Sequence, residues 1–171
     1  PAQARPAEAR PADGDEDGRG AGAAGPADEV SVPNQHRLGD RLVVGGQPRA
    51  TDLRAAAAQG YAIVVSLRTP SEPGFEEERA RAEALGLRFE NVPVDGPSDL
   101  TPATVREVDA LLEAAEGPVL LHCSSGNRTG GLLAMRAWLG GADIDAALAL
   151  GRRAGLTRFE GEVRARLLEL C

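Results

Sequence analysis

The most constraining feature of the sequence is a short apolar run that leads through a small loop into a helical pattern. Residues 118–121 form the run, residues 123–128 form the loop, and the helical pattern continues through 132–139. A strand, a tight loop and a helix N-terminus are therefore expected in that order. The loop amides then point inward and form a site for an anion. A thiol at this place is favoured as its thiolate by the amide dipoles and a guanidinium.

Strand and helix patterns alternate through the middle of the chain. The nearly continuous apolar run at 61–67 is typical of a strand buried on both faces. Further strands are expected at 87–94 and 118–122, with helices at 75–85, after Thr101-Pro102 and from 129 to 139. This alternation predicts an α/β fold, a three-layer sandwich with a largely parallel central sheet.

The remaining elements are expected at the two ends of this pattern. A hairpin is expected over 34–44, with Gly39-Asp40 at its turn. Thr51 is the expected N-cap of a helix over 52–59. Two last helices, over 144–153 and 158–170, would be capped by Asp143 and Thr157 and would cover the sheet.

The first thirty residues differ in composition from the rest. Residues 1–30 are rich in Pro, Ala, Gly and acidic side chains, and such a segment cannot bury enough apolar surface to offset its ordering entropy. We expect a disordered leader over 1–30 and a single α/β domain over 31–171. The sequence starts at Pro, so a preceding signal peptide would make the protein periplasmic or secreted, and otherwise it would be cytoplasmic.

Composition and motifs exclude several classes of protein. A net charge of −7 leaves no electrostatic footprint for nucleic acid. No apolar run approaches the roughly 20 residues that span a membrane. The only histidines, His36 and His122, fit no zinc pattern with the cysteines, and no cofactor motif is present. Cys123 could pair only with Cys171, the last residue, so a disulfide scaffold is not expected. We expect a monomer.

The loop residues have distinct expected roles. Cys123 is the candidate nucleophile, and Arg128 supplies a planar fork for two oxygens of a tetrahedral oxyanion. The Thr129 hydroxyl could donate to the thiolate or cap the helix, and His122 would hold the loop by hydrogen bonds. The residues expected to bind the anion are Ser124, Ser125, Gly126, Asn127, Arg128 and Thr129, mainly through backbone N–H groups.

A second loop faces this one across the sheet edge. Ligands of parallel sheets bind beyond the carboxyl ends of the strands, and loops 95–100 and 123–129 both follow strands. Cleavage of a phosphate ester needs a general acid for the leaving oxygen. Asp95 is the first candidate and Asp99 the second, although either carboxylate could instead cap a helix or face solvent. Gln47 and Arg68 lie on neighbouring loops, at the expected rim.

The stretch His122-Cys123-Ser124-Ser125-Gly126-Asn127-Arg128-Thr129 resembles the active-site loop of the cysteine-dependent protein phosphatases. The upstream segments 42–48 and 64–68 are similar to the first strands of the small dual-specificity-like members. Within that superfamily the chain is most similar to the bacterial beta-lactamase-hydrolase-like phosphatase family, over residues 34–140. The resemblance implies a dual-specificity-phosphatase-like fold and a metal-independent tyrosine-phosphatase-like hydrolase.

The Cys-to-Arg spacing departs from the usual phosphatase loop. Four residues separate Cys123 from Arg128, whereas five are usual; the beta-lactamase-hydrolase-like branch has the shorter form too. Rhodanese-type sulfurtransferases share the shorter loop, and the smaller ring suits a persulfide sulfur.

Three functions therefore follow from the loop. The first is a phosphomonoesterase with a phosphocysteine intermediate, in which Cys123 attacks phosphorus, Arg128 binds oxygens and Asp95 protonates the leaving group. Its substrate would be a phosphorylated protein, phosphotyrosine included, or a small phosphoester. The second is a sulfurtransferase that uses a Cys123 persulfide. The third is a non-catalytic module that binds an oxyanion or a phosphoprotein.

Overall fold

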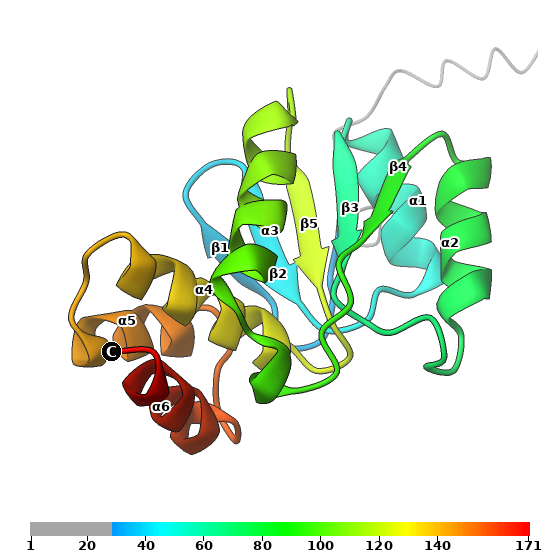
Figure 1. Cartoon of the computed structure of the whole chain (residues 1–171). Helices are drawn as coiled ribbons and strands as arrows, with labels where there is room; N and C mark the ends of the chain where they lie inside the picture. The colour runs from blue at the N-terminus through cyan, green and yellow to red at the C-terminus, as the bar shows by residue number, and fades with distance from the viewer. Residues whose placement is uncertain (1–28) are drawn as a thin grey trace, which may run out of the picture.

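Figure 1 shows the computed structural model of the chain, which describes residues 29–171. The expected leader, 1–30, lies outside the described residues except for its last two, Glu29 and Val30. Val30 and Val32 are buried and pack into the core on one side of the sheet. The described chain is therefore packed almost from its first residue.

The sheet has five strands in the order β1-β2-β5-β3-β4. The strands that pair in parallel are β2 (Leu42–Gly45), β5 (Val119–His122), β3 (Ile63–Ser66) and β4 (Arg88–Asn91), and only β1 (His36–Leu38) pairs antiparallel. The hairpin between β1 and β2 turns at Gly39, whose φ of +65° is the left-handed conformation that glycine adopts readily. The largely parallel sheet and the hairpin at 34–44 are confirmed.

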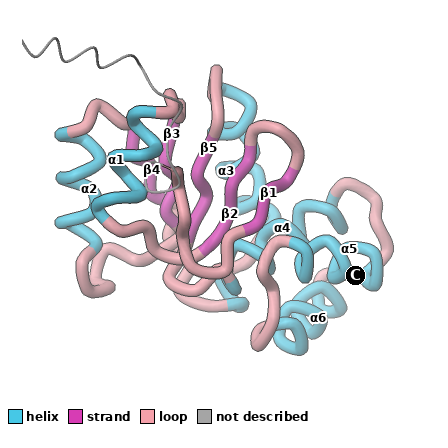
Figure 2. Tube along the Cα trace, turned by 180° about the vertical axis from the view of Figure 1, so that it is seen from behind, coloured by secondary structure: helices cyan, strands magenta, loops and turns pink. Residues whose placement is uncertain are grey.

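Helices cover both faces of this sheet. Figures 1 and 2 show α1 (Ala50–Ala58) and α2 (Phe75–Ala84) on one face. The opposite face carries α3 (Pro102–Ala114) and α4 (Asn127–Leu139), with α5 (Ile144–Arg153) and α6 (Glu160–Glu169) packed against α4; a short 3₁₀ helix, η2 (Pro97–Asp99), precedes α3. The three-layer α/β sandwich predicted from the sequence is confirmed.

The central strand β5 has three consecutive apolar residues, and its position in the sheet explains them. Val119 and Leu121 point into the core beneath α3 and α4, whereas Leu120 points into the core beneath α1 and α2. All four residues of β5 are buried, as are all four of β3. A strand covered on both faces by helices buries every side chain, and the alternation that marks a half-exposed strand is lost.

Two helix starts differ from the prediction. The first helix begins at Ala50, before the expected cap Thr51, and its free backbone N–H at Arg49 is bound by the Asp52 carboxylate (2.8 Å). The last helix begins at Glu160 instead of 158, and Thr157 does not cap it, because its amide and hydroxyl bind elsewhere. The caps at Thr101 and Asp143 are confirmed by hydrogen bonds from the amides of Thr104 and Ala146.

Among residues 29–171, no helix has the length and apolar character to cross a membrane.

Candidate active site

The loop after β5 closes around the sulfur of Cys123. The Cys123 amide donates to Gly45 O on β2 (3.1 Å), which fixes the start of the loop to the sheet. The Gly126 amide donates to Cys123 Sγ at 3.1 Å, so one loop N–H already points at the sulfur. Gly126 has a φ of +91°, and a Cβ at this position would lie 2.8 Å from Asn34 Nδ2. Only glycine fits this turn without strain.

The helix that leaves the loop starts sooner than expected, at Asn127 instead of 129. Arg128 and Thr129 therefore lie in its first turn, where free backbone amides favour an anion. Cys123 and Thr129 are fully buried, and Arg128 is nearly so. The Thr129 hydroxyl has no hydrogen-bond partner among the described residues. Its donation to the Cys123 thiolate remains a prediction.

Two asparagines brace the loop from outside. Asn127 Oδ1 accepts from the amides of Thr157 (2.9 Å) and Phe159 (3.3 Å), which ties the loop to the segment before α6. Asn34 Nδ2 donates to the carbonyls of Ser125 (3.1 Å) and Gly155 (2.9 Å). The expected anion-binding residues thus form one turn that is held from outside. Asn127 contributes to this support through its side chain.

Arg128 makes an ion pair that the sequence analysis did not include. Its Nη1 and Nη2 donate to the two carboxylate oxygens of Glu72 at 2.8 and 2.7 Å. Nη1 also donates to Val94 O (2.9 Å) and Nη2 to Ser124 Oγ (2.9 Å). The hydrogen bonds from Arg128 hold the pKa of Glu72 far below its ordinary value, although partial burial opposes the shift, and the same bonds raise the pKa of Arg128.

A second group of charged side chains lies buried behind the loop. Glu78 Oε1 lies 2.6 Å from His122 Nε2, and Glu78 Oε2 lies 3.6 Å from Arg68 Nη1. All three side chains are at most 3% exposed. His122 Nδ1 donates to Cys123 O (3.1 Å), and Arg68 Nε donates to Ser124 Oγ (3.2 Å). This buried cluster, Arg68, Glu78 and His122, therefore contacts the loop at two points.

Arg68 and Gln47 were both expected at the rim. Arg68 is instead buried and contacts the loop through Ser124. Gln47 is half-buried, and its backbone amide donates to Ser124 O (3.1 Å).

The loop that carries Asp95 and Asp99 reaches the same edge of the sheet. Val94 O, one residue before Asp95, accepts from Arg128, so the segment borders the site. Both aspartates are exposed, and the Asp95 amide donates to the Asp99 carboxylate (3.0 Å). Among the described residues, neither carboxylate has a hydrogen bond to the Cys123 loop. The general acid role of either aspartate remains a prediction.

Glu72 and Glu78 are the site residues that sequence reasoning missed. Glu72 follows the carboxyl end of β3, on the edge that also carries Cys123, so the rule applied to Asp95 could have found it. Glu78 gave no such signal, because it lies within a run of charged residues that begins α2.

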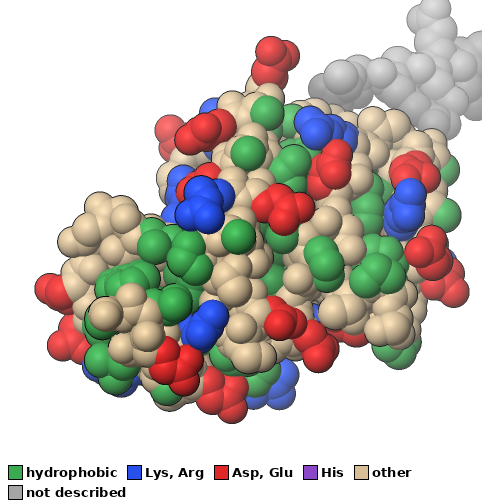
Figure 3. Space-filling model, in the orientation of Figure 1, with side chains coloured by type: hydrophobic (Ala, Val, Ile, Leu, Met, Phe, Trp, Pro, Cys, Tyr) green, Lys and Arg blue, Asp and Glu red, His purple; other side chains and the backbone are tan. Residues whose placement is uncertain are grey.

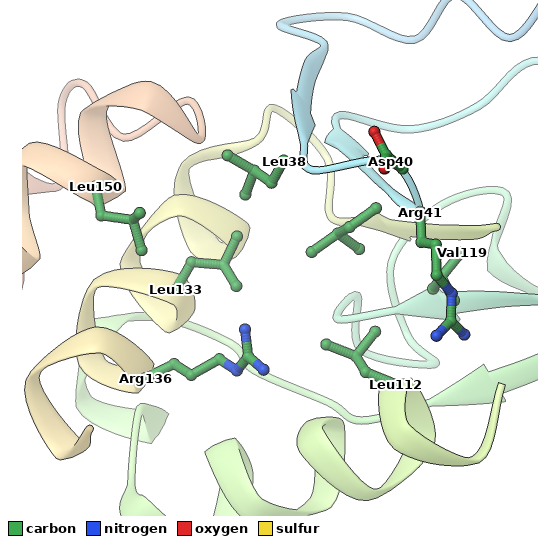
Figure 4. A pocket seen from close by; sticks show the side chains of 9 residues that line it. Leu38, Asp40, Arg41, Leu112, Val119, Leu133, Arg136 and Leu150 are labelled. Atoms are coloured by element: carbon green, nitrogen blue, oxygen red, sulfur yellow. The ribbon is translucent and has the colours of Figure 1, made fainter.

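One hollow, lined by apolar and charged side chains, lies away from this loop. Figure 4 shows it between the β1–β2 turn, α3, α4 and α5, with a volume of about 410 Å³. Leu38, Leu112, Leu133 and Leu150 are among its lining residues. Acidic and basic side chains are interspersed on the face drawn in Figure 3. Asp40, Arg41 and Arg136 also line this hollow, but none of the expected site residues does.

This fold is that of the protein-tyrosine-phosphatase-like phosphatases. Residues 35–139, more than half of the chain, match the family described as the beta-lactamase hydrolase-like protein, phosphatase-like domain. The chain belongs to that family.

Individual relatives agree with this placement. A beta-lactamase hydrolase-like protein of Agrobacterium fabrum is 35% identical over 96 residues, which cover 54% of this chain and 22% of the relative. The chain thus spans about a fifth of that protein's length. TpbA of P. aeruginosa, solved in complex with phosphotyrosine, is 26% identical at a TM-score of 0.61, covering 84% of this chain and 89% of the other.

A more distant structure shares the fold. The core catalytic domain of the PP-IP phosphatase SIW14 from S. cerevisiae, in complex with citrate, has a TM-score of 0.59 at 16% identity. The alignment covers 80% of this chain and 87% of that domain.

Proposed function

We propose that the chain hydrolyses phosphomonoesters through a phosphocysteine intermediate on Cys123. The observation that carries the proposal is the position of Cys123 Sγ, which accepts the Gly126 N–H at the N-terminus of α4. Arg128 lies in the first turn of the same helix and is nearly buried. A thiolate, loop amides and a guanidinium in one enclosed turn are the groups that phosphoryl transfer to sulfur requires.

The reaction has two steps. The Cys123 thiolate attacks phosphorus while the bond to the leaving oxygen breaks, and Asp95 donates its proton to that oxygen. The loop amides and Arg128 bind the equatorial phosphoryl oxygens, whose charge they stabilise. Water then attacks the phosphocysteine, the Asp95 carboxylate accepts its proton, and inorganic phosphate and the free thiolate are released. Asp95 is proposed for this role because Val94, its neighbour, accepts a hydrogen bond from Arg128.

The substrate is proposed to be a phosphorylated protein, phosphotyrosine included, or a small phosphoester. The relative TpbA was solved with phosphotyrosine, and it shares the fold over most of both chains. No cofactor or metal takes part in this mechanism.

A sulfurtransferase is the second candidate, and one observation favours it. Four residues separate Cys123 from Arg128, which makes a small ring that suits a persulfide sulfur. In this alternative, Cys123 accepts a sulfane sulfur from thiosulfate to form a persulfide, and sulfite leaves. Cyanide then removes the sulfur as thiocyanate and restores the thiolate.

A paired assay separates these functions. Wild type, Cys123→Ser and Cys171→Ser would be assayed with an aryl phosphate and with thiosulfate plus cyanide. We expect vanadate-sensitive phosphate release that is lost in Cys123→Ser and kept in Cys171→Ser, because Cys171 is exposed at the chain end. Thiocyanate formation without phosphate release would replace the phosphatase with the sulfurtransferase. Phosphate binding without either turnover would indicate the non-catalytic module.

A further inference from the structure

Glu72 accepts four hydrogen bonds at the candidate site. It lies on the segment 69–74, between β3 and α2, and its side chain is 22% exposed. Oε1 accepts from Arg128 Nη2 (2.7 Å) and Ser124 Oγ (2.8 Å), and Oε2 accepts from Arg128 Nη1 (2.8 Å) and the Thr69 amide (2.6 Å). A carboxylate with four donors is held as firmly as a bound anion would be.

The donors to Glu72 are those that a phosphoryl group would need. Arg128 binds carboxylate and phosphate oxygens through the same planar fork. Here both of its terminal nitrogens are taken by Glu72, and Nη1 has Val94 O as a further acceptor. The Ser124 hydroxyl, in the anion-binding loop, donates to Glu72 as well. The carboxylate therefore competes with an oxyanion for the side-chain donors of the loop.

The charges around the site strengthen this competition. Arg68 Nε lies 3.6 Å from Glu72, but its Nη1 lies at the same distance from buried Glu78. The two guanidinium groups thus face two carboxylates. An arriving dianion is repelled until the Glu72 carboxylate moves out of the fork.

We propose that Glu72 is a specificity-determining residue that fills the Arg128 fork as an internal anion and excludes free oxyanions from the candidate site. An ester substrate gains binding energy from its leaving group and displaces the carboxylate. Inorganic phosphate has no such additional contacts, so the returning carboxylate expels it after hydrolysis. This role of Glu72 rests on the proposed function, because it takes the substrate to be a phosphate ester and the product to be inorganic phosphate.

The segment 69–74 can make this movement at modest cost. Ser71, Pro73 and Gly74 are exposed. The segment is held by the Glu72 side chain, by Arg68 Nη2, which donates to Pro73 O (2.5 Å), and by local backbone bonds such as that from Glu72 N to Thr69 O (3.0 Å). Displacement of Glu72 breaks contacts that the arriving phosphoryl group replaces at Arg128 and Ser124. Only the Thr69 amide then lacks its carboxylate acceptor.

Anion binding to variants tests the proposal without any turnover. Isothermal titration calorimetry with inorganic phosphate and with tungstate would compare wild type, Glu72→Gln, Glu72→Asp and Glu77→Gln. Glu72→Gln removes the competing charge with little change of shape, and Glu72→Asp keeps the charge but shortens its reach. Both should bind the anions at least about tenfold more tightly, the gain expected for loss of a charge-assisted competitor. Glu77→Gln, an exposed carboxylate five residues away, should stay within about twofold because solvent screens its charge.

Equal or weaker anion binding in both Glu72 variants would overturn the proposal, because Glu72 would then be a support that positions Arg128. Hydrogen exchange on the wild type provides a second measurement that does not depend on the variants folding. Saturating phosphate should speed exchange of the Thr69 amide, which loses its acceptor, and slower exchange there would also overturn the proposal. Tighter binding in Glu72→Gln without turnover of any phosphoester would reject the proposed function and keep this inference.

Discussion

At the scale of single residues, the ion pair between Glu72 and Arg128 controls the electrostatics of the candidate site. The pKa of Glu72 lies below its ordinary value of 4.5 in the folded chain, so the unfolded chain takes up a proton first as the pH falls. The stabilisation by this pair is complete above about pH 5 and is lost as the pH falls from there toward the folded-state pKa.

The first prediction follows from this lowered pKa of Glu72. Glu72→Gln should have a lower free energy of unfolding than wild type at pH 7, and the gap should shrink steadily between pH 5 and about pH 3. Urea denaturation at several pH values would measure the gap, with Glu77→Gln as the control. A gap that is constant over this range would show that the carboxylate charge of Glu72 contributes nothing to stability.

The second prediction concerns Glu78, the only carboxylate of the buried cluster. Glu78→Ala leaves Arg68 and His122 buried without their acidic partner, and removal of one member of a buried pair costs about 3–5 kcal/mol. Glu83→Ala, which removes the exposed partner of Arg79 on the same helix, should cost far less. Chemical denaturation of both variants tests the contrast. Similar losses in the two variants would contradict the importance of the cluster.

At the scale of elements, the approach of α4 to the end of α5 holds the loop in place. A Cβ added at Gly130 would lie 2.5 Å from the backbone nitrogen of Leu156, which follows α5. The same segment, a residue further on, supplies Thr157 to the side chain of Asn127. The segment 154–159 therefore touches the first turn of α4 at both its backbone and its side chains.

The third prediction tests this close approach. Gly130→Ala should destabilise the chain by about 1–3 kcal/mol, because backbone atoms must move to admit the methyl group. Gly161→Ala on α6 meets nothing within 4 Å and should stabilise by up to about 1 kcal/mol, the helix preference for alanine. Thermal unfolding would measure the change in stability of each variant relative to wild type. Equal changes in the two variants would contradict the close packing at Gly130.

The elements themselves were largely predictable from the sequence, and their caps less so. Strands β3 and β5 were evident because burial on both faces requires an unbroken apolar run. Thr157 has the chemistry of a cap and precedes a helix, yet its amide and hydroxyl both bind Asn127, thirty residues earlier. A helix cap is predicted from neighbouring residues alone. A side chain distant in sequence, such as Asn127, can bind the groups at a helix start, and the local sequence does not reveal this.

The candidate site was predictable in part, for a related reason. Cys123 and Arg128 come together because one loop holds both, and the sheet topology brings the segment at Val94 to the same edge. The sheet topology determines which segments lie at the same edge, but it does not determine the direction of each side chain. Asp95 was therefore placed at the right edge, although its carboxylate is exposed, and Glu72 was not considered although it binds Arg128.

At the scale of the whole molecule, the parallel sheet gathers the chemistry at one edge. The loops that follow β3 and β5 and the segment that follows β4 supply Glu72, Cys123 and Val94 to the surroundings of Arg128. The hollow of Figure 4 lies elsewhere, and neither Cys123 nor Arg128 lines it. The group that becomes covalently attached to Cys123 therefore distinguishes a phosphatase from a sulfurtransferase.

Mass spectrometry of Cys123 after a denaturing quench at alkaline pH, where a phosphocysteine is stable, tests the phosphatase mechanism most directly. Wild type would be mixed with excess aryl phosphate, quenched within the first turnover and digested, and the Cys123 peptide would be weighed beside the Cys171 peptide. A parallel sample would be treated with thiosulfate. We predict one added phosphoryl group on Cys123, none on Cys171 and none in Cys123→Ser. A sulfur atom added to Cys123 from thiosulfate, with no phosphoryl adduct from the aryl phosphate, would contradict the phosphatase mechanism.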